Sequence, residues 1–164
     1  MKKICILFIL LATGIAGFSQ VDTAAPYYKA GILPDFSLLT IDSVEFDQGI
    51  LDKSKATIIV LFNPECDHCQ HQLETILSIP ELSKHAQIIL SSIETHEKNR
   101  IFYNKNHLEK YPFIHLGKDN KYLFGKYYRP KTIPVLAMYN SSKKLVLFNQ
   151  GDTKKEQILE ALKL

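Results

Sequence analysis

The feature that most constrains the fold of this chain is a pair of cysteines, Cys66 and Cys69, that closely follows an apolar segment. Residues 56–62 are apolar or β-branched throughout, which is typical of a strand buried on both faces of a sheet. After the second cysteine, apolar residues recur at helical spacing, namely Leu73, Ile76 and Leu77. The pattern predicts a strand, a loop and a helix, with Cys66 at or near the start of the helix and Cys69 one turn inside it.

Two thiols at this spacing, between a strand and a helix, can open and close a disulfide without moving the fold. The partial positive charge of a helix N-terminus favours a thiolate at Cys66, and a thiolate is the species that attacks disulfides. A purely structural disulfide is the alternative, but so short a loop gains only ~2 kcal/mol in the chain-entropy model. A chain of 164 residues is long enough to build a proper core without it. The spacing therefore favours redox chemistry.

The first residues have the pattern of a secretory signal. A basic start precedes an apolar run at 4–15, and small residues follow at Gly17 and Ser19. This pattern predicts a signal peptide over residues 1–19, which includes Cys5 and is cleaved after Ser19. As a helix the apolar run would span ~18 Å, against ~30 Å of bilayer hydrocarbon, so cleavage is favoured over the alternative of an uncleaved anchor. We expect the mature protein in the periplasm or cell envelope, where an oxidising environment permits a disulfide between the two remaining cysteines.

Net charge argues against one class of partner. Removal of Lys2 and Lys3 with the signal lowers the formal net charge from +3 to +1. A nearly neutral chain offers no electrostatic basis for binding nucleic acid, and we expect no such partner. We expect residues 20–33 to be a flexible lead-in, followed by one domain over residues 34–164.

The rest of the chain predicts an α/β domain. Apolar and β-branched residues predict strands in five further segments, which are 36–41, 44–46, 87–93, 134–139 and 144–148. The first two would pair as a hairpin. Helical patterns occupy three further segments, which are 95–108, 122–128 and the residues after Thr153. Parallel strands joined by helices come first and a hairpin with a closing helix comes last, which indicates a central mixed sheet flanked by helices.

Individual residues define the bounds and faces of these helices. The helix after Cys69 should end near Ile79, because a following proline disfavours helix at that residue. We expect Thr153 to cap the last helix. The expected inward residues are Ile101, Phe102 and Leu108 in the helix over 95–108, and Ile158, Leu159 and Leu162 in the last helix.

Four motifs together resemble a known superfamily. They are the run Leu33-Pro34-Asp35-Phe36, the run Leu-Phe-Asn-Pro-Glu-Cys-Asp-His-Cys at 61–69, the run Thr132-Ile133-Pro134, and the late Gly151. Over residues 33–164 the chain resembles the thioredoxin superfamily, and most of all its exported, redoxin-related TlpA/ResA-like branch. The resemblance implies a thioredoxin-like fold with an N-terminal β-hairpin extension. Two positions depart from the pattern, since Glu65 replaces a frequent tryptophan and Val60 replaces the buried acid of thioredoxins.

The resemblance also implies roles for individual residues. In this superfamily the first cysteine is the exposed nucleophile, here Cys66, and the second resolves the mixed disulfide, here Cys69. The proline that opens the late strand, here Pro134, has a cis peptide bond and faces the cysteines, so that it and Ile133 would contact the substrate. His68 holds the position of a histidine in exported dithiol oxidases, where an imidazole near the nucleophile stabilises the thiolate.

The function implied is that of a protein-disulfide oxidoreductase in cell redox homeostasis. Its expected substrates are disulfides or dithiols of exported proteins, and a membrane or periplasmic redox partner would restore it. We expect a monomer that needs no cofactor. Both directions of exchange, reductant and oxidant, stay open.

Two other functions use the same residues. Cys66, Cys69 and a histidine, His68 or His71, could serve a thioredoxin-like copper chaperone. Adjacent helix positions point about 100° apart, so these side chains do not converge easily, and we expect no metal site. A peroxidase is the third interpretation, but Asn63 stands where peroxiredoxins carry the activating Thr or Ser.

Overall fold

The computed structural model describes residues 22–163, so the predicted signal peptide lies outside the described residues. The strands are β1 (Ser37–Leu39), β2 (Glu45–Asp47), β3 (Ala56–Leu61), β4 (Ala86–Ser92), β5 (Ile114–Lys118), β6 (Val135–Tyr139) and β7 (Leu145–Gln150). They form one sheet in the order β2-β1-β5-β4-β3-β6-β7. Strands β3, β4 and β5 are parallel to one another, whereas β6 and β7 on one side and β1 and β2 on the other pair antiparallel. The sheet is therefore mixed, as predicted.

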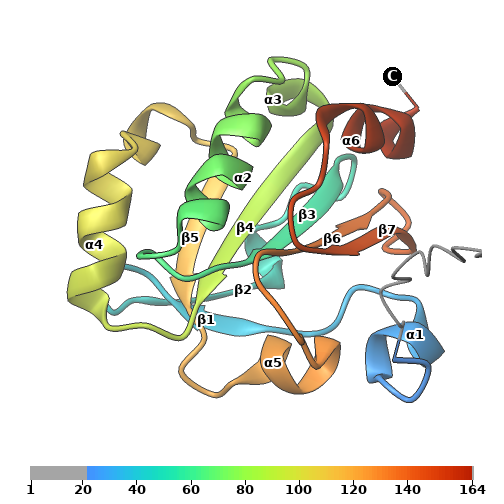
Figure 1. Ribbon diagram of the computed structural model, residues 1–164, viewed down its shortest axis with the longest axis horizontal. Helices are drawn as coiled ribbons and strands as arrows, with labels where there is room; N and C mark the ends of the chain where they lie inside the picture. The colour runs from blue at the N-terminus through green and yellow to red at the C-terminus, as the bar shows by residue number, and fades with distance from the viewer. Residues whose placement is uncertain (1–21, 164) are drawn as a thin grey trace, which may run out of the picture.

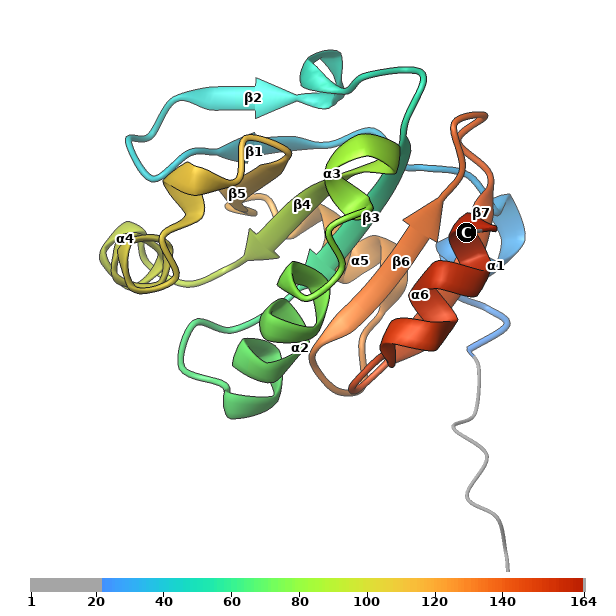
Figure 2. The same ribbon diagram turned by 90° about the horizontal axis from the view of Figure 1, so that it is seen from above.

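Helices cover both faces of this sheet (Figures 1 and 2). They are α1 (Pro26–Ala30), α2 (Asp67–Leu77), α3 (Leu82–His85), α4 (His96–Lys105), α5 (Leu123–Tyr128) and α6 (Lys155–Leu162), with 3-10 turns η1 (Gln48–Ile50) and η2 (Leu108–Lys110). Side chains of α2, α3, α4 and α6 form the core of one face, and those of α1 and α5 form the core of the other. None of the helices in residues 22–163 is both long and apolar enough to cross a bilayer.

Strand β3 shows why the central segment is apolar without interruption. Ile58 and Val60 belong to the core beneath α2, whereas Ile59 and Leu61 belong to the core beneath α5. Successive strand residues point to opposite faces, so a strand covered by helices on both faces needs apolar residues at every position. All residues of β3 and β4 are buried. The two long apolar segments are thus the centre of the sheet, and β3 leads directly to the cysteines.

The structure confirms the α/β fold with its N-terminal hairpin, and it adds one strand that the sequence analysis missed. Strand β5 pairs in parallel with β4 over five residues. Its sequence is short and contains His115 and Gly117, so it lacks the uniform apolar character of its neighbours. Gly117 is required by packing, because a Cβ atom there would lie 2.7 Å from Leu38 and from Phe46.

Three local expectations were wrong. Ile101 is 60% exposed while the adjacent Phe102 is buried, because neighbouring helix residues point about 100° apart and only one can face the core. Thr153 does not cap α6, whose N-cap residue is Lys154, and Thr153 is instead buried. The described part of the expected flexible lead-in contains α1 and buries Tyr27 against the aromatic ring of Phe148.

Candidate functional site

Cys66 is the N-cap residue of α2, at the point where the loop after β3 turns into the helix. Its backbone is extended, with φ −96° and ψ 119°, and its N–H donates to the carbonyl oxygen of Asn63 at 3.1 Å. The Sγ atom of Cys66 accepts a hydrogen bond from the backbone N–H of Cys69 at 3.3 Å. A sulfur in this position receives both an N–H donor and the positive end of the helix dipole, and both favour negative charge on it.

Cys69 lies one turn into α2 and differs sharply from Cys66 in its surroundings. Cys69 is 2% exposed, whereas Cys66 is only partly buried, and both are free thiols. Burial raises the pKa of the Cys69 thiol to about 12, and its hydrogen bond with Cys66 and the negative charge of Asp152 add to the effect. The pair therefore consists of a partly exposed cysteine at a helix terminus and a buried cysteine whose thiol stays protonated at neutral pH.

The structure brings Pro134 and Ile133 to the same end of the sheet as the cysteines. The bond between Ile133 and Pro134 is cis, and Pro134 immediately precedes β6. Leu61 at the end of β3 pairs with Val135 at the start of β6. Because these strands are antiparallel, Pro134 lies level with the loop that carries Cys66. Ile133 also packs against the core cluster that Cys66 contacts.

His68 is exposed on the first turn of α2 and is directed to a carboxylate. Its Nδ1 atom lies 3.1 Å from Oδ2 of Asp152, which is in the loop between β7 and α6. The side chain of Asp152 is itself 43% exposed. The sequence analysis did not identify Asp152, although it follows Gly151, one of the residues that carried the resemblance.

Residues 151–153 join the separate parts of this site. The N–H of Gly151 donates to the carbonyl oxygen of Pro134 at 2.7 Å. Gly151 has φ +86°, a backbone conformation that glycine adopts far more readily than other residues. On the other side, the buried side chain of Gln72 in α2 bonds both backbone groups of Thr153. This segment, hereafter the 151–153 segment, therefore links the loop of Pro134 to the cysteine helix.

Glu65, which precedes the first cysteine, belongs to an ionic network with α4. The Nζ atom of Lys98 lies 2.6 Å from a carboxylate oxygen of Glu65 and 3.3 Å from one of Glu94. These two carboxylates raise the pKa of Lys98. Asn63 completes the network by donating its side-chain amide to Glu94 at 2.9 Å. The negative charge beside Cys66 is thus paired with a lysine, and the loop is fixed to α4.

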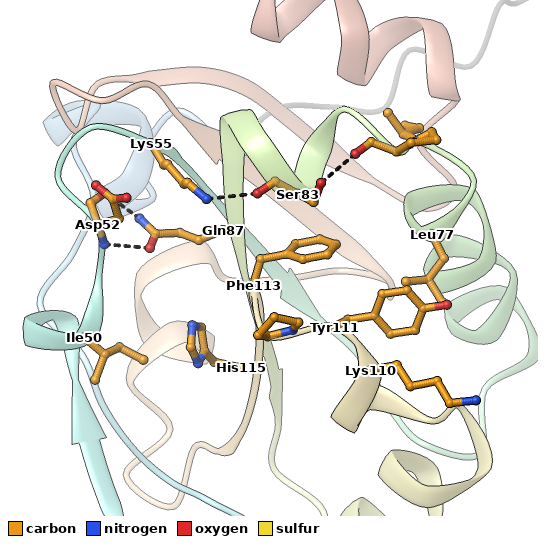
Figure 3. A pocket seen from close by; sticks show the side chains of 13 residues that line it. Ile50, Asp52, Lys55, Leu77, Ser83, Gln87, Lys110, Tyr111, Phe113 and His115 are labelled. Carbon is orange, nitrogen blue, oxygen red and sulfur yellow. Dashed lines mark hydrogen bonds between the residues drawn. The ribbon is translucent and has the colours of Figure 1, made fainter.

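A small cavity adjoins the cysteine loop, and a larger one lies elsewhere. The small cavity has a volume of about 180 Å³, and its lining includes Asn63 and Ile133. The larger cavity, about 750 Å³, has Tyr111 and Phe113 at its centre with His115 to one side (Figure 3). It adjoins the residues that precede β3, β4 and β5, whereas the cysteine loop follows the opposite end of β3. The larger cavity therefore does not belong to the cysteine site.

A metal centre was the alternative use of the cysteines. Within residues 22–163, no three side chains among His, Cys, Asp and Glu are grouped so as to hold a metal ion. Nδ1 of His68 faces Asp152, and His71 lies 3.8 Å from Glu74, its neighbour on the exposed face of α2. The described part of the chain thus shows no third side chain of these types grouped with Cys66 and Cys69.

Comparison with known proteins gives structural relatives only, since neither a protein-family model nor a curated protein matches the chain. A secreted disulfide oxidoreductase of Mycobacterium tuberculosis, homologous to E. coli DsbE, has a TM-score of 0.63 and 14% identity over 78% of this chain and 94% of that one. StoA of Bacillus subtilis has a TM-score of 0.60 and 20% identity over 80% and 98% of the two chains. The exposed lipoprotein thioredoxin Etrx1 of Streptococcus pneumoniae has a TM-score of 0.60 and 21% identity over 79% of this chain and 98% of that one. These likenesses, together with the sheet order and the position of the cysteines, show that the chain has the thioredoxin-like fold that its sequence predicted.

Proposed function

We propose that this protein is a thiol–disulfide oxidoreductase that exchanges disulfides with exported proteins. The observation that carries the proposal is the contrast between its two thiols, since an accessible Cys66 caps a helix and a buried, protonated Cys69 lies one turn behind it. A nucleophile and a resolving group need these different surroundings. The structural neighbours include a secreted disulfide oxidoreductase and an exposed lipoprotein thioredoxin, which agrees with this function.

The proposed reaction has two steps. The thiolate of Cys66 attacks a disulfide of the substrate, forms a mixed disulfide and releases one substrate sulfur as a thiolate. The sulfur of Cys69 then attacks Cys66, which releases the second substrate sulfur and leaves a disulfide between the two cysteines. The substrate gains two electrons and the protein loses them. A dithiol partner in the membrane or periplasm restores the protein, and the reverse sequence would oxidise a substrate.

The substrate would bind beside Pro134. Pro134 and Ile133 lie at the cysteine end of the sheet, and the carbonyl of Pro134 is already held by the N–H of Gly151. That bond restrains the backbone of the loop next to Ile133, the residue that would contact the substrate. A rigid docking edge next to a nucleophile lowers the entropy cost of forming the mixed disulfide.

We place the protein in the periplasm or cell envelope as a monomer. The support for this location is the signal pattern of residues 1–19 and the secreted or exposed nature of two structural neighbours. An oxidising compartment supplies the protein disulfides on which such a site acts.

Trapping of the mixed disulfide tests the proposal. In a Cys69→Ala variant the second step is blocked, so envelope proteins should stay attached to Cys66 and be released by dithiothreitol. Cys66→Ala is the matched control and should capture none. The purified wild-type protein should also reduce insulin disulfides in the presence of dithiothreitol. Absence of both capture and insulin reduction would refute the assignment, and stoichiometric copper after reductive purification would support metal delivery instead.

A further inference from the structure

The residue before the first cysteine departs from the pattern of the superfamily, and this departure raises the question of what holds the loop. Glu65 stands where a tryptophan is frequent. Its side chain is 65% exposed, so this residue does not anchor the loop in the core. The position of Cys66 therefore depends on other contacts of the loop, and these contacts are polar and ionic.

The loop from Asn63 to Cys66 is a tight turn. The N–H of Cys66 donates to the carbonyl oxygen of Asn63 at 3.1 Å, and Pro64 occupies the second position of the turn, which its fixed φ suits. The side-chain oxygen of Asn63 also accepts from the N–H of Glu65 at 2.8 Å. Asn63 thus bonds the turn twice, and the backbone position of Cys66 depends on where Asn63 is held.

Four residues close a network around this turn, hereafter the loop network. The Oδ1 atom of Asn63 accepts from the N–H of Glu65, whose carboxylate lies 2.6 Å from the Nζ atom of Lys98. The same Nζ atom lies 3.3 Å from Oε2 of Glu94, and Oε1 of Glu94 accepts from Nδ2 of Asn63 at 2.9 Å. Each member therefore contacts two others, and Lys98 in α4 is the basic member.

The loop network is attached to the centre of the sheet. The N–H of Glu94 donates to Oγ of Ser92, the last residue of β4, at 3.1 Å, and the side chain of Glu94 is only 25% exposed. A single exposed ion pair contributes little to stability, whereas a closed network of charges and hydrogen bonds restrains its members together. The position of β4 is thus transmitted to the turn that carries Cys66.

We propose that Lys98 is a positioning residue for the resolving step of disulfide exchange. Through Glu94 and Asn63 it holds the turn of the first cysteine, which keeps the sulfur of Cys66 aligned for attack by Cys69. This inference rests on the proposed exchange function.

The two steps of exchange differ in how much alignment they need. In the resting protein the Sγ atom of Cys66 accepts a hydrogen bond from the N–H of Cys69 at 3.3 Å, so the two cysteines are held in one arrangement. A small displacement of a reacting group strongly slows an intramolecular step. A small disulfide that approaches Cys66 from solvent can instead adjust its own position. Loss of the loop network should therefore slow the attack by Cys69 more than the attack by Cys66.

The loop network also makes this alignment depend on ionic strength. Both ion pairs of Lys98 involve side chains that are partly exposed, and dissolved salt screens such pairs. The resolving step should therefore slow as the salt concentration rises. This response should disappear when Lys98 is replaced by a neutral residue.

A two-phase reaction with 4,4′-dithiodipyridine measures the two steps separately. This disulfide carries no charge near neutral pH, so its approach does not depend on the charges of the protein. The first equivalent of pyridinethione reports the attack by Cys66. The second equivalent reports the resolution by Cys69, which is the slower phase at high probe concentration because that thiol is buried and protonated. Stopped flow at about pH 7 compares the wild type with Lys98→Met, and Lys105→Met, from the exposed last turn of α4, is the matched control.

In Lys98→Met at low salt we expect the second phase to slow about tenfold. The first phase should change less than about twofold, which also shows that the variant is folded. Asn63→Ala should slow the second phase by a similar factor, and the double variant should be slower by less than about twofold more, because both residues act through one network. Lys105→Met should match the wild type. About 0.5 M NaCl should slow the second phase of the wild type at least about threefold and leave that of Lys98→Met unchanged.

Equal second-phase rates in Lys98→Met and the wild type at low salt would overturn the inference. A double variant in which the two effects multiply would overturn it as well, because Lys98 would then act independently of Asn63. An equal slowing in Lys105→Met would assign the effect to the net charge of α4 and would have the same consequence. None of these results would affect the proposed function, which a wild-type protein without any first phase would refute.

Discussion

The side-chain amide of Gln72 holds the backbone of Thr153 from two sides. Its Oε1 atom accepts from the N–H of Thr153 at 2.6 Å, and its Nε2 atom donates to the carbonyl oxygen of Thr153 at 3.2 Å. Both residues are buried, and they are 81 positions apart in the chain. The contact fixes the 151–153 segment to α2, so the cysteines, Asp152 and the loop of Pro134 keep their mutual positions.

Replacement of Gln72 should therefore destabilise the fold more than an ordinary polar substitution. Gln72→Leu keeps the volume but leaves the N–H and the carbonyl of Thr153 buried without partners, and we expect a loss of about 2–4 kcal/mol. Urea denaturation of the reduced protein measures it. Gln70→Leu is the matched control, because Gln70 is only partly buried and water can replace its bonds to Asn106. If both variants lost a similar free energy of unfolding, the buried contact between Gln72 and Thr153 would stabilise the fold no more than an exposed one.

His68 should make the protein a weaker reductant. A positive charge at the start of α2, the helix that Cys66 caps, would stabilise the reduced form, and a stabilised reduced form raises the reduction potential. We expect the wild-type potential to lie above roughly −270 mV, the value for thioredoxin, and His68→Ala to lower it by about 30 mV. Equilibration with glutathione measures both values. His71→Ala, exposed on the same helix, should leave the potential unchanged, and an unchanged potential in His68→Ala would remove His68 from the mechanism.

Local patterns in the sequence were enough to predict the centre of the molecule. The apolar run of β3, the cysteine pair and the helical spacing that follows are all set by residues within one stretch of chain, and the structure has them as predicted. The resemblance to thioredoxin-like proteins added the cis bond at Pro134, which the structure also has. Neighbouring residues decide the strand, the loop and the helix, so one sequence is sufficient to find them, whereas the cis bond needed the family resemblance.

The missed features depend on contacts between distant segments. Asp152 contacts His68 only because the sheet brings the end of β7 beside α2. The residues that follow Gly151 have no sequence pattern that predicts this contact. By its sequence context Gln72 is an ordinary polar residue of an amphipathic helix, and only the fold places Thr153 opposite it. Strand β5 is defined by its pairing with β4 more than by its own residues. Sequence periodicity cannot report such pairings.

Gly117 should tolerate no side chain. A Cβ atom at this position in β5 would lie 2.7 Å from the Cβ atom of Leu38 and 2.7 Å from the ring of Phe46, both in the N-terminal hairpin. Gly117→Ala would have to push the hairpin away from the sheet, which we expect to cost about 1–3 kcal/mol. Thermal unfolding followed by circular dichroism measures the change. Ile101→Ala, on the exposed face of α4, is the control and should cost under about 0.5 kcal/mol.

The raised pKa of Cys69 also makes the stability of the reduced protein depend on pH. In the unfolded chain a cysteine thiol loses its proton near pH 8.5, whereas burial keeps Cys69 protonated in the folded protein up to about pH 12. Between these values the folded state binds more protons than the unfolded state, so stability falls as pH rises, by up to about 1.4 kcal/mol per pH unit. Below about pH 8 this contribution is fully present.

Urea denaturation of the reduced protein at about pH 8 and pH 10 measures this fall. Buried tyrosines such as Tyr128, whose pKa burial also raises, contribute in the same direction, so the comparison needs a variant. In Cys69→Ala the loss of stability between the two pH values should be smaller than in the wild type by about 1–2 kcal/mol. Cys66→Ala removes the partly exposed thiol and its hydrogen bond with Cys69 but leaves the burial of Cys69, which is the largest cause, so this variant should keep most of the loss. If Cys69→Ala lost as much stability as the wild type, Cys69 would ionise as easily in the folded protein as in the unfolded chain, and the contrast between the two thiols would disappear.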